Sequence, residues 1–211
     1  MAMNSGRSPP ELLGSTAGAS VLRRLVHLDT ALSLQLHRFC RPLPRFLLLS
    51  LEISGDGRFF FPVVLSFLLL PLSSPDLRPI LAALVLGGVL DLLFIGILKH
   101  IVRRPRPVYN KGMNLAFAVD HWSFPSGHAS RVFFIASICH LSSDSIEEPF
   151  KRYGASVESV VLCLSLWAAA TSLSRVLLGR HFVLDVFAGA CLGVLEGVLV
   201  FRSLKLCGSW L

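Results

Sequence analysis

The run from Pro79 to Val102 constrains this chain most, because it is almost wholly apolar and long enough to cross a lipid bilayer. A transmembrane helix needs about 20 predominantly apolar residues. Further apolar runs follow at Pro125–Leu141, Val157–Leu173 and Phe182–Phe201, and an earlier one, Phe59–Leu72, contains two prolines. We therefore expect an all-α integral membrane protein, a helical bundle of about five to six helices.

Composition agrees with a membrane protein. Of the 211 residues, 53% are hydrophobic and 16% are charged, whereas soluble domains carry about 25% charged residues. The net charge of +7 is compatible with nucleic-acid binding. However, the Arg and Lys residues mostly flank apolar runs, where they favour contact with anionic lipid. We expect membrane lipids as partners and no nucleic acid; the sequence does not indicate an oligomeric state.

The chain divides into three parts. We expect a disordered N-terminal tail over 1–20, with a transit peptide as the alternative, then amphipathic or interfacial helices over 21–57 and a membrane-embedded core over 58–207. Val21–Phe39 has helical spacing and a polar face, which predicts a helix along the membrane surface. Phe46–Ser54 is too short to cross and ends at a glycine-containing break.

Several polar residues have structural interpretations. The cysteines show no CxxC pair and no metal-ligand spacing, so we interpret them as small core residues; they are Cys40, Cys139, Cys163, Cys191 and Cys207. Asp91 and Glu196 lie inside apolar crossings, where a carboxylate is costly, and we expect each to pair within the bundle. Arg104 and Arg180 are interpreted as interfacial anchors or pocket rims, and Ser123 as part of the pocket entrance.

The order of the crossings places distant residues on one membrane face. The chain leaves the bilayer at Lys99 and re-enters at Pro125, then leaves at Leu141, re-enters at Val157 and leaves again at Ser174. The first and last exits are therefore on the same side. The residues expected to meet there are Lys99, Arg106, Ser126, Gly127, His128, Ser174, Arg175, His181 and Asp185.

The chemistry of this set suits a phosphate group. Ser126, Gly127 and His128 precede an apolar run, so they are expected at a helix start, whose free N–H groups attract anions. Lys99, Arg106 and Arg175 supply three cations. On a helix, His181 and Asp185 would stand one above the other, so the carboxylate could orient the imidazole. His128 supplies a second proton-transfer group.

These residues carry a resemblance to a known family. Lys99 is followed by six residues and Arg106-Pro107. Pro125-Ser126-Gly127-His128 comes next, and Ser174-Arg175 has five residues before His181 and three more before Asp185. This arrangement resembles the three-part signature of the type 2 phosphatidic acid phosphatase (PAP2) superfamily. Within it the chain is most similar to the plant lipid phosphate phosphatase beta type and the polyisoprenoid diphosphate phosphatases.

The resemblance implies residue roles. His181 attacks phosphorus and forms a phosphohistidine, Asp185 orients the ring, and His128 protonates the leaving oxygen and then activates water. Lys99, Arg106, Ser126, the Gly127 amide and Arg175 bind the phosphate oxygens. No metal or other cofactor is implied, and the activity expected is that of a metal-independent lipid phosphate phosphatase.

Location narrows the substrate to lipids with an anionic head, such as phosphatidic acid, lysophosphatidic acid or isoprenoid diphosphates. We expect the protein to reside in the endoplasmic reticulum or in a plastid membrane, and the sequence does not decide which side of the membrane the site faces.

One alternative is a catalytically silent lipid-binding or scaffold protein of the same fold, although inactive relatives would be expected to lose a catalytic residue. A small transporter would need an internal repeat that the sequence lacks. A vanadium haloperoxidase, which shares the pocket, is disfavoured by the membrane-spanning segments.

Overall fold

The computed structural model describes residues 16–70, 77–110, 121–151 and 154–206. These residues form helices and connecting loops, with one isolated β-bridge between Pro105 and Trp122. The described helices are α1 (Thr16–Phe39), α2 (Arg45–Ser54), α3 (Gly57–Leu69), α4 (Leu77–Val102), α5 (Gly127–Leu141), α6 (Ser143–Lys151), α7 (Val157–Leu177) and α8 (Val183–Leu206).

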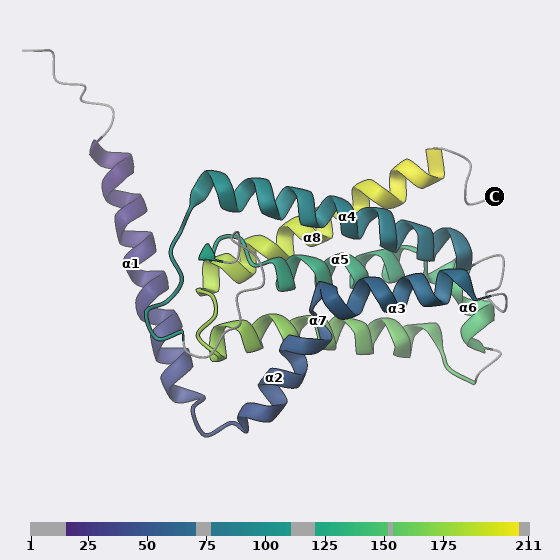
Figure 1. The fold of residues 1–211 in the computed structure, drawn as a ribbon, viewed down its shortest axis with the longest axis horizontal. Coiled ribbons are helices and arrows are strands. Elements are labelled where there is room, and N and C mark those ends of the chain that lie inside the picture. The colour runs from purple at the N-terminus through teal and green to yellow at the C-terminus, as the bar shows by residue number, and fades with distance from the viewer. Residues whose placement is uncertain (1–15, 71–76, 111–120, 152–153, 207–211) are drawn as a thin grey trace, which may run out of the picture.

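Five helices, α3, α4, α5, α7 and α8, run along a common direction and form the bundle, while α1 crosses one end of it at a steep angle (Figure 1). The expected all-α membrane bundle is confirmed. The helix count is higher than expected, because α1, α2 and α6 add to these five. The tail expected over 1–20 lies largely outside the described residues, and α1 begins at Thr16 rather than at Val21.

The connection between the apolar runs that end at Leu141 and begin at Val157 contains helix α6, for which no expectation was drawn from the sequence. Ile146 anchors this helix, since it is 3% exposed and belongs to the main apolar cluster. On the outer side, Lys151 lies 3.9 Å from carboxylate oxygens of both Glu147 and Glu148. Ile146, the partly buried Phe150 and charges at helical spacing account for a short helix in this polar segment.

Three described helices, α4, α7 and α8, are long and apolar enough to cross a membrane, and α3 is a shorter apolar helix. The protein is therefore integral to a membrane.

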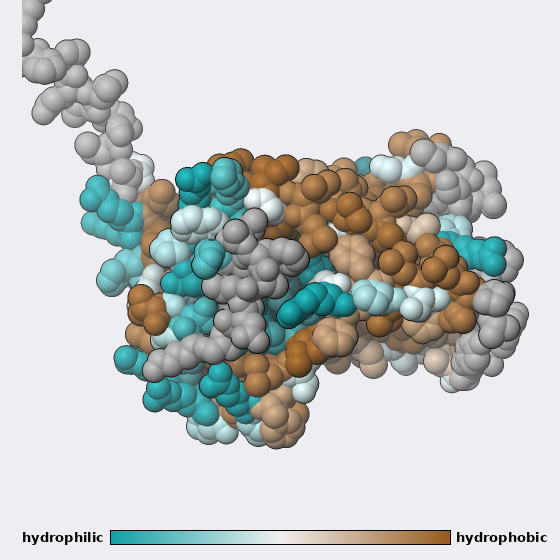
Figure 2. Space-filling model, in the orientation of Figure 1, coloured by the Kyte–Doolittle hydropathy of each residue, from teal (hydrophilic) through white to brown (hydrophobic). Residues whose placement is uncertain are grey.

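Helix α5 has only 15 residues and buries polar side chains such as Ser130 and Arg131. Its place among α4, α7 and α8 explains how it tolerates them (Figure 1). Figure 2 shows hydrophobic residues along the bundle and hydrophilic ones gathered at the end crossed by α1.

The packing of α5 against α8 depends on glycines of α8. A side chain at Gly189 would collide with the carbonyl oxygen of Ser126, and one at Gly193 would collide with that of Ser130. Small residues at such positions let two helix backbones approach closely inside a membrane. The close approach lets the Ser126 N–H donate to the Asp185 carbonyl oxygen at 2.9 Å. It therefore sets the register of the two helix ends that carry the site.

Of the two carboxylates expected to pair within the bundle, Asp91 makes an ion pair, whereas the oxygens of Glu196 are buried without a hydrogen-bond partner among the described residues. Asp91 of α4 is fully buried, and its Oδ2 lies 3.3 Å from a guanidinium nitrogen of Arg131 on α5. Glu196 of α8 is 3% exposed and interacts electrostatically with both residues. This cluster joins three helices below the site and supplies a counter-charge for the buried arginine.

Candidate active site

The N-terminus of α5 forms one wall of the site. Ser126 is the N-cap residue, in an extended conformation, and its hydroxyl oxygen accepts from the Ala129 N–H at 3.5 Å. Gly127 is the first helical residue and His128 follows it. The prediction of a helix start at this position is confirmed. It presents free N–H groups and the positive end of the helix dipole, both of which favour an anion.

Four helix ends meet at this end of the bundle (Figure 1). Lys99 lies in the last turn of α4 and Arg175 in the last turn of α7, while Asp185 lies in the first turn of α8. The charges of Lys99, Arg106 and Arg175 all act on the His181 ring. The structure thus brings together the residues that the crossing order placed on one face. Most of them are buried, with Arg175 0% exposed and His181 2%, whereas Arg106, Gly127 and His128 are partly exposed.

The position of the protons on His181 follows from its two neighbours. Its Nδ1 lies 2.8 Å from the carbonyl oxygen of Ser123, which can only accept a hydrogen bond. Its Nε2 lies 3.2 Å from a guanidinium nitrogen of Arg106, which can only donate. Nδ1 therefore carries the hydrogen and Nε2 carries the lone pair. This is the tautomer that a nucleophilic imidazole requires.

The surroundings keep this ring neutral. The pKa of His181 is lowered well below its usual value, first because the ring is buried and then because of the positive charges of Arg106, Arg175 and Lys99. The hydrogen bond to Ser123 acts in the opposite direction. A neutral ring keeps the Nε2 lone pair available at physiological pH.

The contact between His181 and Asp185 differs from the one expected. The helix begins at Val183, so His181 lies before it and the two side chains are not stacked on helical turns. Asp185 Oδ2 is 3.7 Å from His181 Nδ1 and accepts from the Phe182 N–H at 2.9 Å. Oδ1 is 2.7 Å from Arg104. Asp185 thus lies beside the ring without a direct hydrogen bond to it, while the Ser123 carbonyl holds Nδ1.

His128 is the second histidine of the site. The positive charges of Arg175, Arg131 and Lys99 act on its ring, and His181 is also close enough to interact with it, which places His128 in the same group. Its Nε2 is buried and makes no hydrogen bond with any residue of the described ranges. A buried ring nitrogen without a partner is available for a substrate oxygen.

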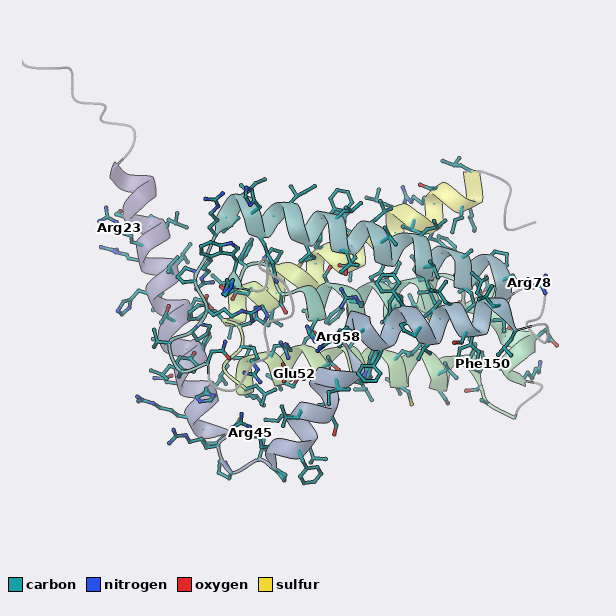
Figure 3. The ribbon with its side chains drawn as sticks, in the orientation of Figure 1. Arg23, Arg45, Glu52, Arg58, Arg78 and Phe150 are labelled. Carbon is teal, nitrogen blue, oxygen red and sulfur yellow. The ribbon has the colours of Figure 1, made fainter. Side chains whose placement is uncertain are left out.

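Glu52 of α2, labelled in Figure 3, is a site residue that the sequence analysis missed. Its Oε1 lies 2.6 Å from the Arg175 guanidinium and 3.3 Å from that of Arg180. Burial tends to raise the pKa of Glu52, but the two arginines outweigh this and lower it. Glu52 therefore stays ionised and holds Arg175 in place. One feature of the sequence could have identified Glu52 as a site residue: it is the one carboxylate in the apolar run Phe46–Ser54.

Arg104, Arg180 and Ser123 were also undervalued, since they were interpreted as anchors, rims or entrance. Arg180 is 2% exposed, and it donates to Asn110 Oδ1 at 2.8 Å. Ser123 is fully buried and contacts His181 through its backbone carbonyl, which side-chain motifs do not reveal. Asp29 of α1 was missed as well: its Oδ2 is 2.7 Å from Arg104, a contact joining the first helix to the site.

The fold and site together define a class of protein: an integral membrane helical protein with a neutral, oriented histidine among buried cations. The PAP2 superfamily model matches residues 77–208, more than half of the chain, and the chain belongs to this superfamily. It is 46% identical over 197 residues to the Arabidopsis thaliana protein named probable lipid phosphate phosphatase beta, covering 86% of this chain and 91% of the relative.

Two solved structures share the fold of this chain. The first transmembrane PAP2 type phosphatidylglycerolphosphate phosphatase from Bacillus subtilis superposes with a TM-score of 0.70 at 22% identity, covering 86% of this chain and 87% of that one. LpxE of Aquifex aeolicus superposes with a TM-score of 0.61 at 25% identity, covering 83% and 95%.

Proposed function

We propose that this protein is a lipid phosphate phosphatase that hydrolyses phosphate monoesters or diphosphates with a lipid tail, through a phosphohistidine at His181. The observation that carries the proposal is the arrangement of this ring: Nδ1 is committed to Ser123, and Nε2 faces the cation Arg106. Cations close to a nucleophile favour a substrate with several negative oxygens. The membrane bundle and the family of the chain support a lipid substrate.

In the first step, the Nε2 lone pair attacks phosphorus and the bond from phosphorus to the ester oxygen breaks. Lys99, Arg106 and Arg175, with Ser126 and the Gly127 N–H, hold the other phosphate oxygens. The positive charge that develops on the ring is stabilised by Asp185 at 3.7 Å. The protonated His128 ring, favoured by the bound phosphate anion, gives its proton to the departing lipid oxygen.

In the second step, the neutral His128 ring takes a proton from water, and the water oxygen attacks phosphorus. The bond from phosphorus to Nε2 breaks, which returns His181 to its starting form and releases phosphate. Protein cations supply the charge neutralisation that Mg²⁺ supplies in kinases. The proposed reaction is therefore independent of added metal.

Phosphate release tests this function directly. Purified protein in detergent micelles, with chelator present, should release phosphate from a lipid phosphate, and His181→Ala should reduce the rate at least about a hundredfold. His140→Ala is the matched control, because His140 lies exposed at the other end of α5. Dependence on metal, or wild-type activity in the His181 variant, would reject the mechanism. Lipid binding by wild-type protein without hydrolysis would favour the silent scaffold.

The role of His128 can be separated from that of His181. In His128→Ala, an aryl phosphate with a good leaving group should phosphorylate His181, since that leaving group needs no proton. Release should remain slow, because no base activates the water, so acid-labile phosphoprotein should accumulate. Absence of phosphoprotein under these conditions would remove the two-step mechanism.

The proposal also concerns which lipid phosphates the protein hydrolyses and which cellular membrane contains it. We expect phosphatidic acid, lysophosphatidic acid and isoprenoid diphosphates to be hydrolysed, and water-soluble sugar phosphates to be poor substrates. Comparison of kcat/KM across such a panel ranks them. We expect tagged protein to fractionate with endoplasmic reticulum membranes or with a plastid membrane.

A further inference from the structure

Helix α1 is attached to the bundle in an unusual way. Among its residues whose side chains the structure describes, the only buried ones are polar: Asp29 is 5% exposed and Ser33 is 0% exposed. Apolar residues such as Leu25, Leu28 and Leu32 are exposed instead. A helix held by packing would bury an apolar stripe. The described part of α1 thus buries polar side chains more deeply than its apolar ones, and the contacts of Asp29 and Ser33 are directed at one end of the bundle.

These contacts complete the N-terminus of α8. The Val183 N–H donates to Ser33 Oγ at 2.9 Å, and the Leu184 N–H donates to Asp29 Oδ1 at 3.0 Å. The preceding N–H, of Phe182, donates to Asp185. Free N–H groups at a helix start need acceptors, and Phe182 has no side-chain acceptor to offer at the N-cap position. Helix α1 therefore provides two caps that the local sequence lacks.

Asp29 makes a second contact that Ser33 does not make. Its Oδ2 lies 2.7 Å from one terminal nitrogen of Arg104, while the other terminal nitrogen lies 2.7 Å from Asp185 Oδ1. The guanidinium also lies over the Phe182 ring, 4.0 Å from its centroid. Because a guanidinium is planar and rigid, fixing one nitrogen fixes the direction of the other. Asp29 thus determines how Arg104 holds Asp185.

The balance of charge around Arg104 also indicates that Asp29 affects Asp185. Arg104 stands between two carboxylates, so its positive charge is shared between Asp29 and Asp185. If Asp29 were neutral, Arg104 would be balanced by Asp185 alone, and less negative charge would act on His181, 3.7 Å away. The ring develops positive charge as it attacks phosphorus, so that loss would raise the barrier of the chemical step.

We infer that Asp29 is a positioning residue for the phosphatase reaction, acting through Arg104 on Asp185, so that docking of α1 is part of the catalytic apparatus. The inference rests on the proposed roles of His181 and Asp185. Asp29 is separated from the phosphate site by Arg104 and Asp185, so it should affect kcat and leave KM nearly unchanged.

The test compares Asp29→Asn with Ser33→Ala. Asparagine keeps an oxygen for the Leu184 N–H but removes the charge facing Arg104. Ser33→Ala removes the cap on the Val183 N–H and a long hydrogen bond, 3.5 Å, from Ser33 Oγ to Asp29 Oδ1, but it leaves the Asp29 charge and its ion pair with Arg104 in place. We expect Asp29→Asn to lower kcat about tenfold or more with KM within about twofold, and Ser33→Ala to keep kcat within about threefold. Asp29→Glu, which retains the charge, should recover a large part of the lost kcat. Melting temperatures in detergent report folding of each variant.

A double-mutant cycle tests whether Asp29 acts on Asp185 through Arg104. In an Arg104→Ala background, Asp29→Asn should change kcat less than about twofold, because its route to Asp185 is already gone. Four results would each overturn the inference. Two concern Asp29→Asn: a normal kcat, or a rise in KM alone. The other two are an equal loss of kcat in Ser33→Ala and additive losses in the double-mutant cycle. His181→Ala, measured in the same assay, separates the role of Asp29 from the proposed function. If His181→Ala is inactive and Asp29→Asn has normal kcat, only the positioning role of Asp29 is refuted.

Discussion

The Oδ2 atom of Asp185 lies 3.7 Å from Nδ1 of His181, and that nitrogen is held instead by the Ser123 carbonyl oxygen at 2.8 Å. Orientation and charge are thus supplied to the ring by two different groups. A backbone carbonyl fixes the tautomer, and a carboxylate supplies negative charge without a direct hydrogen bond. Loss of the carboxylate charge should therefore impair the chemical step without freeing the ring.

Asp185→Asn should lower kcat by about a hundredfold or more, with KM little changed, because the charge that stabilises the developing imidazolium is lost. Steady-state phosphate release measures both parameters. Asp56→Asn is a suitable control: Asp56 likewise accepts from a backbone N–H and pairs with an arginine, Arg58, but at the start of α3. A comparable loss in both variants would contradict the proposed role of Asp185.

Glu52→Ala should destabilise the protein and reduce phosphate binding, since it leaves the buried guanidinium of Arg175 without its carboxylate partner. Removal of one partner of a buried ion pair costs about 3–5 kcal/mol. Thermal unfolding in detergent, with KM for a lipid phosphate, measures the effect. Glu147→Ala, at an exposed residue of α6 that lies 3.9 Å from Lys151, should change stability by less than about 0.5 kcal/mol. Equal effects of the two substitutions would argue against Glu52 as a support for the site.

Stability should fall as the pH is lowered below about 6.5. The pKa of His181 is lowered in the folded protein, so in this range the unfolded chain binds a proton that the native ring does not. The free energy of unfolding then decreases by up to about 1.4 kcal/mol per pH unit, until the pH reaches the native pKa. Melting curves of wild type and His181→Ala between pH 8 and pH 5 test this. The wild type should show the steeper decline; identical slopes would mean that His181 is not held neutral.

Gly193→Ala should weaken the contact between α5 and α8, because the added methyl group would collide with the Ser130 carbonyl oxygen. Overpacking of this kind costs about 1–3 kcal/mol, and it should also lower activity by displacing Asp185 relative to Ser126. Gly96→Ala on α4 is the matched control, since no atom lies within 4 Å of the position that its Cβ would take. A Gly193 variant as stable as the Gly96 variant would show that the close approach is not required.

The sequence alone determined the bundle and the set of residues that converge. Lengths of apolar runs fix where a chain can cross a bilayer, and the order of crossings fixes which loops share a face. Lys99, His128 and His181 could therefore be placed together from the sequence alone. The N-cap at Ser126 was also readable, because capping is a local interaction between neighbouring residues.

Only the tertiary structure decided how those residues are held. The start of α8 at Val183 placed His181 outside the helix, and a backbone carbonyl became its partner. Glu52 and Asp29, from helices outside the family match, reached the arginines of the site. Contacts between residues far apart in the chain depend on how helices pack and on which charges are left to neutralise. Spacing along the sequence carries neither kind of information.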